Sequence, residues 1–320
     1  MAVGCDYHED LPRIAVETLG LADRFCCPAC HEMHALWPFI RLAGPWLGGE
    51  ASSPRLVSAL ADSFAEGRRT VLIAGAADTG LLALTARAGG THCPDIAVLD
   101  RCATRLEACR LLAARWGLPI ETMQADMTEL DPPARFDVVL VHGTLHFIPT
   151  DRRADALARL RRAMRPDGRL VLRFNAGGAR ARALAPADLD RYADRVLDAL
   201  GRLAVPLPEE REALRARLRT YAQFREERDG TLGDPADIRA ALTRSGFAVR
   251  DWCEFGVEPG PQQAAGSKRR FPRSRRAGLS RSILTEGPQT SATSRSDERV
   301  RGIRRYSPVS AQPMSSRNAR

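Results

Sequence analysis

The sequence predicts an α/β protein with a doubly wound, mostly parallel sheet, and three observations lead to this fold class. Short apolar runs alternate with helical patterns between Thr70 and Phe174. The runs are apolar at nearly every position, which is typical of strands covered on both faces. The first run leads into a turn of small residues, GAADTG (Gly75–Gly80), and then directly into a helix. We therefore expect a ligand to approach the backbone at this turn.

The expected elements follow the alternation in order. The predicted strands are Thr70–Gly75, Asp95–Asp100, Pro119–Asp126, Arg135–Gly143 and Gly168–Phe174. Helices are predicted after the first, second and fourth of them, at Thr79–Ala88, Ala103–Gly117 and Thr150–Met164. Each predicted helix places apolar residues at helical spacing, so each can cover one face of the sheet.

A helical insertion interrupts the alternation at about 185–227. It contains two predicted helices, each opened by a proline, at residues 186–203 and 208–227. The alternation resumes with a helix that has Asp234 as N-cap and Gly246 at its end, followed by a strand at residues 247–255. Insertions in open sheets lie at the carboxyl ends of the strands, so this one either shapes a substrate pocket or only caps the sheet.

Charge divides the chain into regions. Residues 262–320 hold 14 Lys/Arg and 3 Asp/Glu, whereas residues 1–261 hold 34 basic and 36 acidic residues. We predict an N-terminal arm at 1–50, a domain at 51–286 and a disordered basic tail at 287–320, with Leu279–Glu286 as a short edge strand. The tail is interpreted as a solvated extension, with a tether for nucleic acid or an acidic partner as the alternative. The near-neutral domain favours a small-molecule substrate.

Neither a membrane span nor a signal peptide is predicted. The chain has no apolar run of about 18 residues, and its first residues lack a basic segment followed by an apolar one. We therefore expect a cytoplasmic protein whose eight cysteines are thiols.

The ends of the first three strands carry the predicted ligand site. Gly75, Ala76 and Ala77 let a ligand approach, and Gly80 allows close helix packing. Asp100 ends the second strand, where a carboxylate can accept both hydroxyls of a ribose, although it could instead serve the following helix N-terminus. Asp126 could accept from an adenine amino group or be a loop carboxylate. The turn lacks the second glycine of a dinucleotide fingerprint, and Lys268 is the only lysine, so nicotinamide and P-loop ligands are disfavoured.

Five stretches resemble the successive motifs of class I S-adenosylmethionine-dependent methyltransferases: VLIAGAADTG, IAVLD, TMQADMTEL, RFDVVLVHGTLHFI and RRAMRPDGRLVLRF. The resemblance covers about Thr70–Phe174 and implies a Rossmann-like methyltransferase fold with S-adenosylmethionine as cofactor. It also implies that Gly75 faces the methionine part, that Asp100 holds the ribose and that Asp126 meets the adenine. The full predicted cofactor-binding set is Gly75, Ala76, Ala77, Gly80, Asp100, Arg101, Asp126, Met127 and His142.

The first motif departs from the family pattern. The family often has an acid two residues before the first glycine, where this chain has Ile73; Asp78 could replace it. Methyl transfer to a small molecule is the predicted function. The alternative is a non-catalytic methyltransferase-like binding module that uses its basic tail for interaction.

Two further clusters could carry chemistry. His142 and His146 follow the fourth strand, where either could be a general base or a packing residue. The segment CCPACHEMH (Cys26–His34) contains C-x-x-C-H, which can mark haem attachment in exported proteins. It could also hold zinc through Cys27, Cys30, His34 and one of Cys5, His8 or Cys26. Because only one C-x-x-C pair exists, we expect no metal and interpret the cluster as buried thiols in an arm over the cofactor site.

Overall fold

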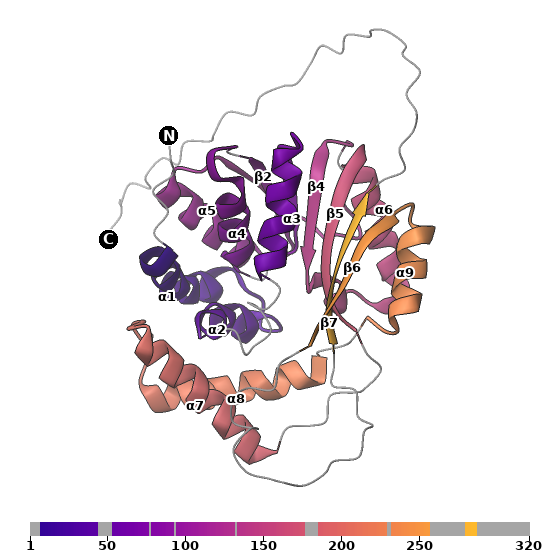
Figure 1. Cartoon of the computed structure of the whole chain (residues 1–320). Helices are drawn as coiled ribbons and strands as arrows, with labels where there is room; N and C mark the ends of the chain where they lie inside the picture. The colour runs from indigo at the N-terminus through magenta and orange to yellow at the C-terminus, as the bar shows by residue number, and fades with distance from the viewer. Residues whose placement is uncertain are drawn as a thin grey trace, which may run out of the picture. The chain divides into compact units, whose positions relative to one another are not determined.

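A seven-stranded sheet forms the centre of the fold in the computed structural model of the chain, which describes residues 7–43, 53–76, 78–92, 94–131, 133–176, 185–228, 232–256 and 279–286. The strand order is β3-β2-β1-β4-β5-β7-β6 (Figure 1). The strands are β1 (Thr70–Ala74), β2 (Asp95–Asp100), β3 (Ile120–Gln124), β4 (Phe136–His142), β5 (Met164–Ala176), β6 (Ala248–Gly256) and β7 (Leu279–Glu286). This architecture confirms the predicted doubly wound, mostly parallel fold.

The register places the ends of the first four strands at one edge. Leu72 of β1 pairs in parallel with Ala97 of β2 and with Val139 of β4, and β3 continues the parallel set beside β2. Only β7 runs antiparallel to its neighbours β5 and β6. The expected strand at Leu279–Glu286 therefore exists, but the prediction of an edge position was wrong. It is hydrogen-bonded on both sides, which a sequence of mixed polarity does not reveal.

Nine helices lie within the described residues, and those of the α/β core cover both faces of the sheet (Figure 1). They are α1 (Tyr7–Phe25), α2 (His31–Leu42), α3 (Ser53–Ala65), α4 (Gly80–Gly89), α5 (Ala103–Trp116), α6 (Arg153–Ala163), α7 (Pro186–Arg202), α8 (Arg211–Arg228) and α9 (Pro235–Arg244). Asp234 caps α9 as predicted, since its carboxylate accepts from the Ala236 amide at 2.8 Å. Helix α8 begins three residues later than predicted, because its first backbone bond joins the Leu214 amide to the Glu210 carbonyl.

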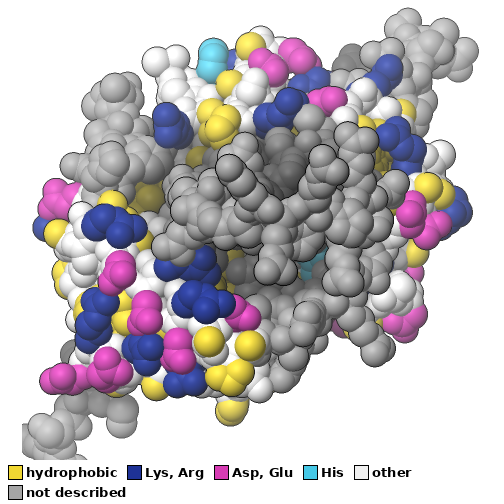
Figure 2. All heavy atoms as spheres, turned by 60° about the horizontal axis from the view of Figure 1, so that its bottom comes forward, with side chains coloured by type: hydrophobic (Ala, Val, Ile, Leu, Met, Phe, Trp, Pro, Cys, Tyr) yellow, Lys and Arg dark blue, Asp and Glu magenta, His cyan; other side chains and the backbone are white. Residues whose placement is uncertain are grey.

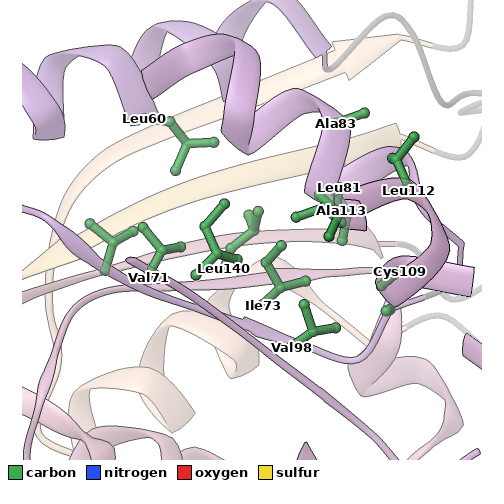
Figure 3. Packing of buried hydrophobic residues seen from close by; sticks show 14 of the residues in the cluster. Leu60, Val71, Ile73, Leu81, Ala83, Val98, Cys109, Leu112, Ala113 and Leu140 are labelled. Carbon is green, nitrogen blue, oxygen red and sulfur yellow. The ribbon is translucent and has the colours of Figure 1, made fainter. Parts of the chain in front are cut away.

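Alternate residues of the strands divide between two buried cores. Val71, Ile73 and Leu140 face the cluster that contains α3, α4 and α5, whereas Leu72 and Val139 face the one that contains α6 and α9. Figure 3 shows the first cluster, with Ile73, Val98 and Leu140 pointing toward Leu60 and Leu81. Because both faces are buried, the strands need apolar residues at every position, as the sequence has them.

A third core joins the N-terminal helices to the helical insertion. Leu36, Phe39 and Ile40 of α2 are fully buried in one cluster with residues of α7 and α8, such as Leu197 and Leu218. Glu32 of α2 also accepts from both Nε and Nη2 of Arg217 of α8, at 3.0 and 3.1 Å. Segments about 180 residues apart thus form one helical layer, here named the helical cap (α1, α2, α7 and α8). None of the described helices is both long and apolar enough to cross a membrane.

Candidate cofactor site

The turn after β1 is the centre of the candidate site. Gly75 has φ +85°, a conformation that favours glycine, and its amide donates to the Leu99 carbonyl at 2.8 Å. A Cβ at Gly75 would overlap the side chain of Thr144, whose hydroxyl donates to the Gly75 carbonyl at 3.2 Å. The backbone of β1 therefore approaches both β2 and the loop after β4. The sequence indicated the glycine but gave no signal for Thr144; Ala77 lies outside the described residues.

Asp100 connects this turn to the next strand. Its Oδ2 accepts from the Ala76 amide at 3.0 Å, and its Oδ1 accepts from the Cys102 amide at 2.8 Å. Burial raises the pKa of Asp100, and these bonds together with the nearby Arg105 only partly oppose the shift. Both oxygens keep a second lone pair for a ligand hydroxyl. The carboxylate is thus also part of the local structure, which its position at a strand end does not show.

Asp126 follows β3 and is held by its own loop. Its Oδ1 accepts from the amide and the hydroxyl of Thr128, at 2.8 and 2.7 Å. Its Oδ2 lies 3.4 Å from Nε of Arg101. Burial alone would raise the pKa of Asp126, but the Thr128 bonds and Arg101 outweigh it and lower the pKa. The predicted residues Asp126 and Arg101 are therefore together, whereas the Met127 side chain is 5% exposed and packs in the core.

A residue of the helical cap closes the other side of the turn. Arg41 of α2 donates to Oδ2 of Asp78, and Oδ1 of Asp78 accepts from the Gly80 amide at 2.7 Å. A Cβ at Gly80 would overlap the Arg41 guanidinium, so the close packing expected at Gly80 is with this side chain. Asp78 is 5% exposed and both of its oxygens are engaged, while Ile73 is fully buried. Sequence reasoning missed Arg41, although it is the one charged residue within the apolar stretch ALWPFIRLAGPW.

The two histidines occupy different environments after β4. His146 is 8% exposed, and its Nδ1 donates to the Gly143 carbonyl at 2.8 Å. His142 ends β4, where burial, followed by the positive charge of Arg173, lowers its pKa to about 3. The His142 imidazole is therefore neutral near pH 7. It can donate or accept a hydrogen bond there, but it is a weak base.

Comparison with known proteins addresses the same region. The family model described as "Methyltransferase domain" matches residues 71–168. These residues hold β1 to β4 and the four strand ends just described. Residues 71–168 are therefore similar to a methyltransferase domain, as the sequence motifs in the same region implied.

One curated protein and several solved structures are similar to parts of the chain. The carboxy-S-adenosyl-L-methionine synthase of Ectopseudomonas mendocina (strain ymp) is 37% identical over 76 residues, which is 24% of this chain and 30% of that protein. A Burkholderia thailandensis 1,6-didemethyltoxoflavin-N1-methyltransferase structure is 18% identical with a TM-score of 0.48, covering 89% of this chain and 93% of that one. The N-methyltransferase NodS of Bradyrhizobium japonicum WM9 is 12% identical with a TM-score of 0.46, covering 81% and 99%.

S-adenosylmethionine is the cofactor that the motif resemblance implies, and two features of the turn bear on whether the residues present fit it. Gly75 has φ +85° and lies against Thr144, so the turn has no room for a side chain at this position. Burial raises the pKa of the Asp100 carboxyl, and its two amide bonds and nearby Arg105 do not cancel this effect. The site therefore combines a glycine turn with a carboxylate, Asp100, whose ionised form would be stabilised by hydroxyl donors.

Proposed function

We propose that this protein transfers a methyl group from S-adenosylmethionine to a small-molecule acceptor. The observation that carries the proposal is the joining of Gly75 and Asp100 through the Ala76 amide at the carboxyl ends of β1 and β2. Ligands of open α/β sheets bind at this edge. Within the proposal, Gly75 faces the methionine part, Asp100 accepts the ribose hydroxyls and Oδ2 of Asp126 accepts from the adenine.

The chain's own contribution to the reaction is alignment. The sulfonium of the cofactor supplies an activated methyl group, so the protein needs to hold the acceptor in line and exclude water. His142, with its pKa lowered to about 3, is assigned to the cofactor shell and not to proton abstraction. Acceptors that are already nucleophilic near pH 7 suit such a site best.

Charge supports a small acceptor over a nucleic acid. Basic and acidic side chains are interspersed on the face shown in Figure 2, where no large patch of one sign is visible among the described residues. On α7 and α8 these charges are paired, as in Arg215 with Asp194 at 2.6 Å and Arg211 with Asp198 at 2.7 Å. Nucleic-acid binding depends on unpaired basic side chains that neutralise phosphates.

The test has a binding step and a transfer step. Thermal shift of the full chain with S-adenosylhomocysteine is expected to raise the melting temperature, while NAD at the same concentration leaves it unchanged. Transfer of labelled methyl groups to a panel of small amines, thiols and phenols then tests catalysis. Binding without transfer to any small molecule would favour the non-catalytic binding module, and stabilisation by NAD alone would refute the cofactor assignment.

A further inference from the structure

Four metal-ligating side chains from three separate places in the chain converge at one point outside the cofactor turn. They are Cys26, directly after α1, Cys30, the N-cap of α2, His34 in the first turn of α2, and Cys102, the N-cap of α5. Their sulfur and nitrogen ligand atoms all lie within 4.8 Å of one another. We propose that Cys26, Cys30, His34 and Cys102 form a structural zinc site.

Local backbone structure aims two of these side chains at one point. The His34 amide donates to the Cys30 carbonyl at 3.0 Å, so Cys30 and His34 lie one helical turn apart on the same face of α2. The His31 amide donates to the Cys27 carbonyl at 3.1 Å, which forms the tight turn between α1 and α2. This turn brings Cys26 close to Cys30 and His34. Cys27, by contrast, is exposed.

The distances suit tetrahedral coordination. The Sγ atoms of Cys26 and Cys102 are 3.6 Å apart. Nδ1 of His34 lies 3.2 Å from the first and 3.1 Å from the second. Zinc bonds of about 2.3 Å to sulfur and about 2.0 Å to nitrogen separate tetrahedral ligand atoms by roughly 3.5–3.8 Å, so small shifts would admit the ion. The 3.6 Å sulfur separation is well beyond a disulfide bond.

Two features of the surroundings would stabilise bound thiolates against the burial that raises the pKa values of Cys26 and Cys30. The Thr104 hydroxyl lies 3.0 Å from Sγ of Cys26 and can donate to it. Cys102 stands at the N-terminus of α5, where the helix dipole stabilises negative charge. Zinc with three thiolates and one neutral imidazole has a net charge of −1, and its formation releases the three thiol protons.

A buried cation beside the cluster has the matching charge. Arg105 is 2% exposed, and its Nε and Nη1 have no hydrogen-bond partner among the described residues. It follows Thr104 in α5 and interacts electrostatically with His34 and with Asp100. A buried guanidinium is costly without a counter-charge. An anionic zinc centre would add a counter-charge to that of Asp100, whereas neutral thiols would not.

The site has no open position for a substrate, so its role is structural. It would fasten the start of the helical cap to the loop between β2 and α5. The Cys102 amide also donates to Asp100, so the ion would fix the residue that follows the proposed ribose ligand by two positions. The proposed ligand set differs from the one considered from the sequence, which contained Cys27 and omitted Cys102. The proposal also departs from the expectation that these cysteines are metal-free thiols.

The test is the metal content of the full chain, produced with added zinc and purified without chelator. We expect about one zinc per chain, a loss of that zinc in Cys102→Ser, and full retention in the matched control Cys27→Ser. This readout does not involve methyl transfer, so it is independent of the proposed function. Metal lost equally from Cys27→Ser and Cys102→Ser would overturn the ligand set.

A second measurement covers the case in which Cys102→Ser does not fold. Wild-type chain, stripped by a chelator under reducing conditions, is titrated with Co²⁺ alone and followed by absorption. Sulfur-to-cobalt charge-transfer bands and tetrahedral visible bands at about one equivalent are expected. Absence of both zinc and these bands would overturn the proposal, as would a Cys26–Cys102 disulfide found by peptide mapping after rapid alkylation.

Discussion

Two carboxylates, the buried Asp137 and the partly buried Asp100, join strands at opposite ends of the sheet, and their environments differ. At the amino ends, Oδ2 of Asp137 accepts from the Arg69 and Thr70 amides at 2.8 and 2.9 Å, and Oδ1 accepts from Arg165 at 2.7 Å. Burial alone would raise the pKa of Asp137, but these bonds and the Arg165 charge lower it. At the carboxyl ends, the pKa of Asp100 is raised, because its two amide bonds and the nearby Arg105 do not offset burial.

We propose that this difference separates a structural carboxylate, Asp137, from a ligand-binding one, Asp100. Asp137 gains more from its partners than burial costs, so it stabilises the folded chain. Asp100 forms a similar bridge between strands, but burial still disfavours its ionised form. A ligand that donates hydrogen bonds to such a carboxylate, as the hydroxyls of a ribose do, would stabilise its ionised form. Each prediction below tests one side of this comparison.

The largest expected loss of stability follows Asp137→Ala. The change leaves two strand amides without their acceptor and Arg165 without its partner, so we expect the free energy of unfolding to fall by about 2–4 kcal/mol. S-adenosylhomocysteine affinity should stay the same, because Asp137 lies at the other end of the strands. Urea unfolding and calorimetric titration measure the two quantities, and Asp167→Ala, an exposed change at the same end, is the control. A large loss of affinity in a folded Asp137→Ala would contradict the division.

A smaller loss of stability than that of Asp137→Ala is expected from Gly75→Ala. The new Cβ would carry φ +85° and meet Thr144, so we expect a cost of roughly 1–3 kcal/mol together with weaker cofactor binding. Gly67→Ala is the matched control, because Gly67 has φ +91° but nothing within 4 Å of the added Cβ. Urea unfolding of both variants gives the steric part of the cost as their difference. Equal losses would show that the Thr144 contact is unimportant.

Near pH 7 the smallest effect is that of His142, because its influence on stability appears only at acid pH. Its folded pKa of about 3 is below the usual value of 6.5, so the unfolded chain binds the proton first as the pH falls. Its contribution to stability is complete above pH 6.5 and is lost between pH 6.5 and about 3, at up to about 1.4 kcal/mol per pH unit. His142→Gln should flatten this part of a stability–pH profile measured by urea unfolding. A profile unchanged by His142→Gln would show that the imidazole is not held neutral.

Local patterns in the sequence predict the turn but not its partners. Gly75 and Asp100 were identifiable because a strand end, a glycine and an acid at the next strand end are features of short segments. Arg41 contacts Asp78 across 37 positions, and Cys26 meets Cys102 across 76. Such pairs depend on how α1 and α2 pack against the α/β core, which periodicity within one segment does not determine. The interior place of β7 depends on its pairing with β5 and β6, which the pattern within its own segment does not determine either.

Calorimetric titration of the wild type, Asp100→Ala and Asp95→Ala with S-adenosylhomocysteine tests the central claim most directly. Asp95 is the matched control because it is an exposed carboxylate at the amino end of the same strand. Loss of two hydrogen bonds to a charged acceptor, partly replaced by water, is worth roughly 2–4 kcal/mol. We therefore expect Asp100→Ala to bind about 30- to 1000-fold more weakly, while Asp95→Ala binds like the wild type. Equal affinity of all three proteins would contradict the assignment of Asp100 to the ribose, and no binding by the wild type would contradict the cofactor site itself.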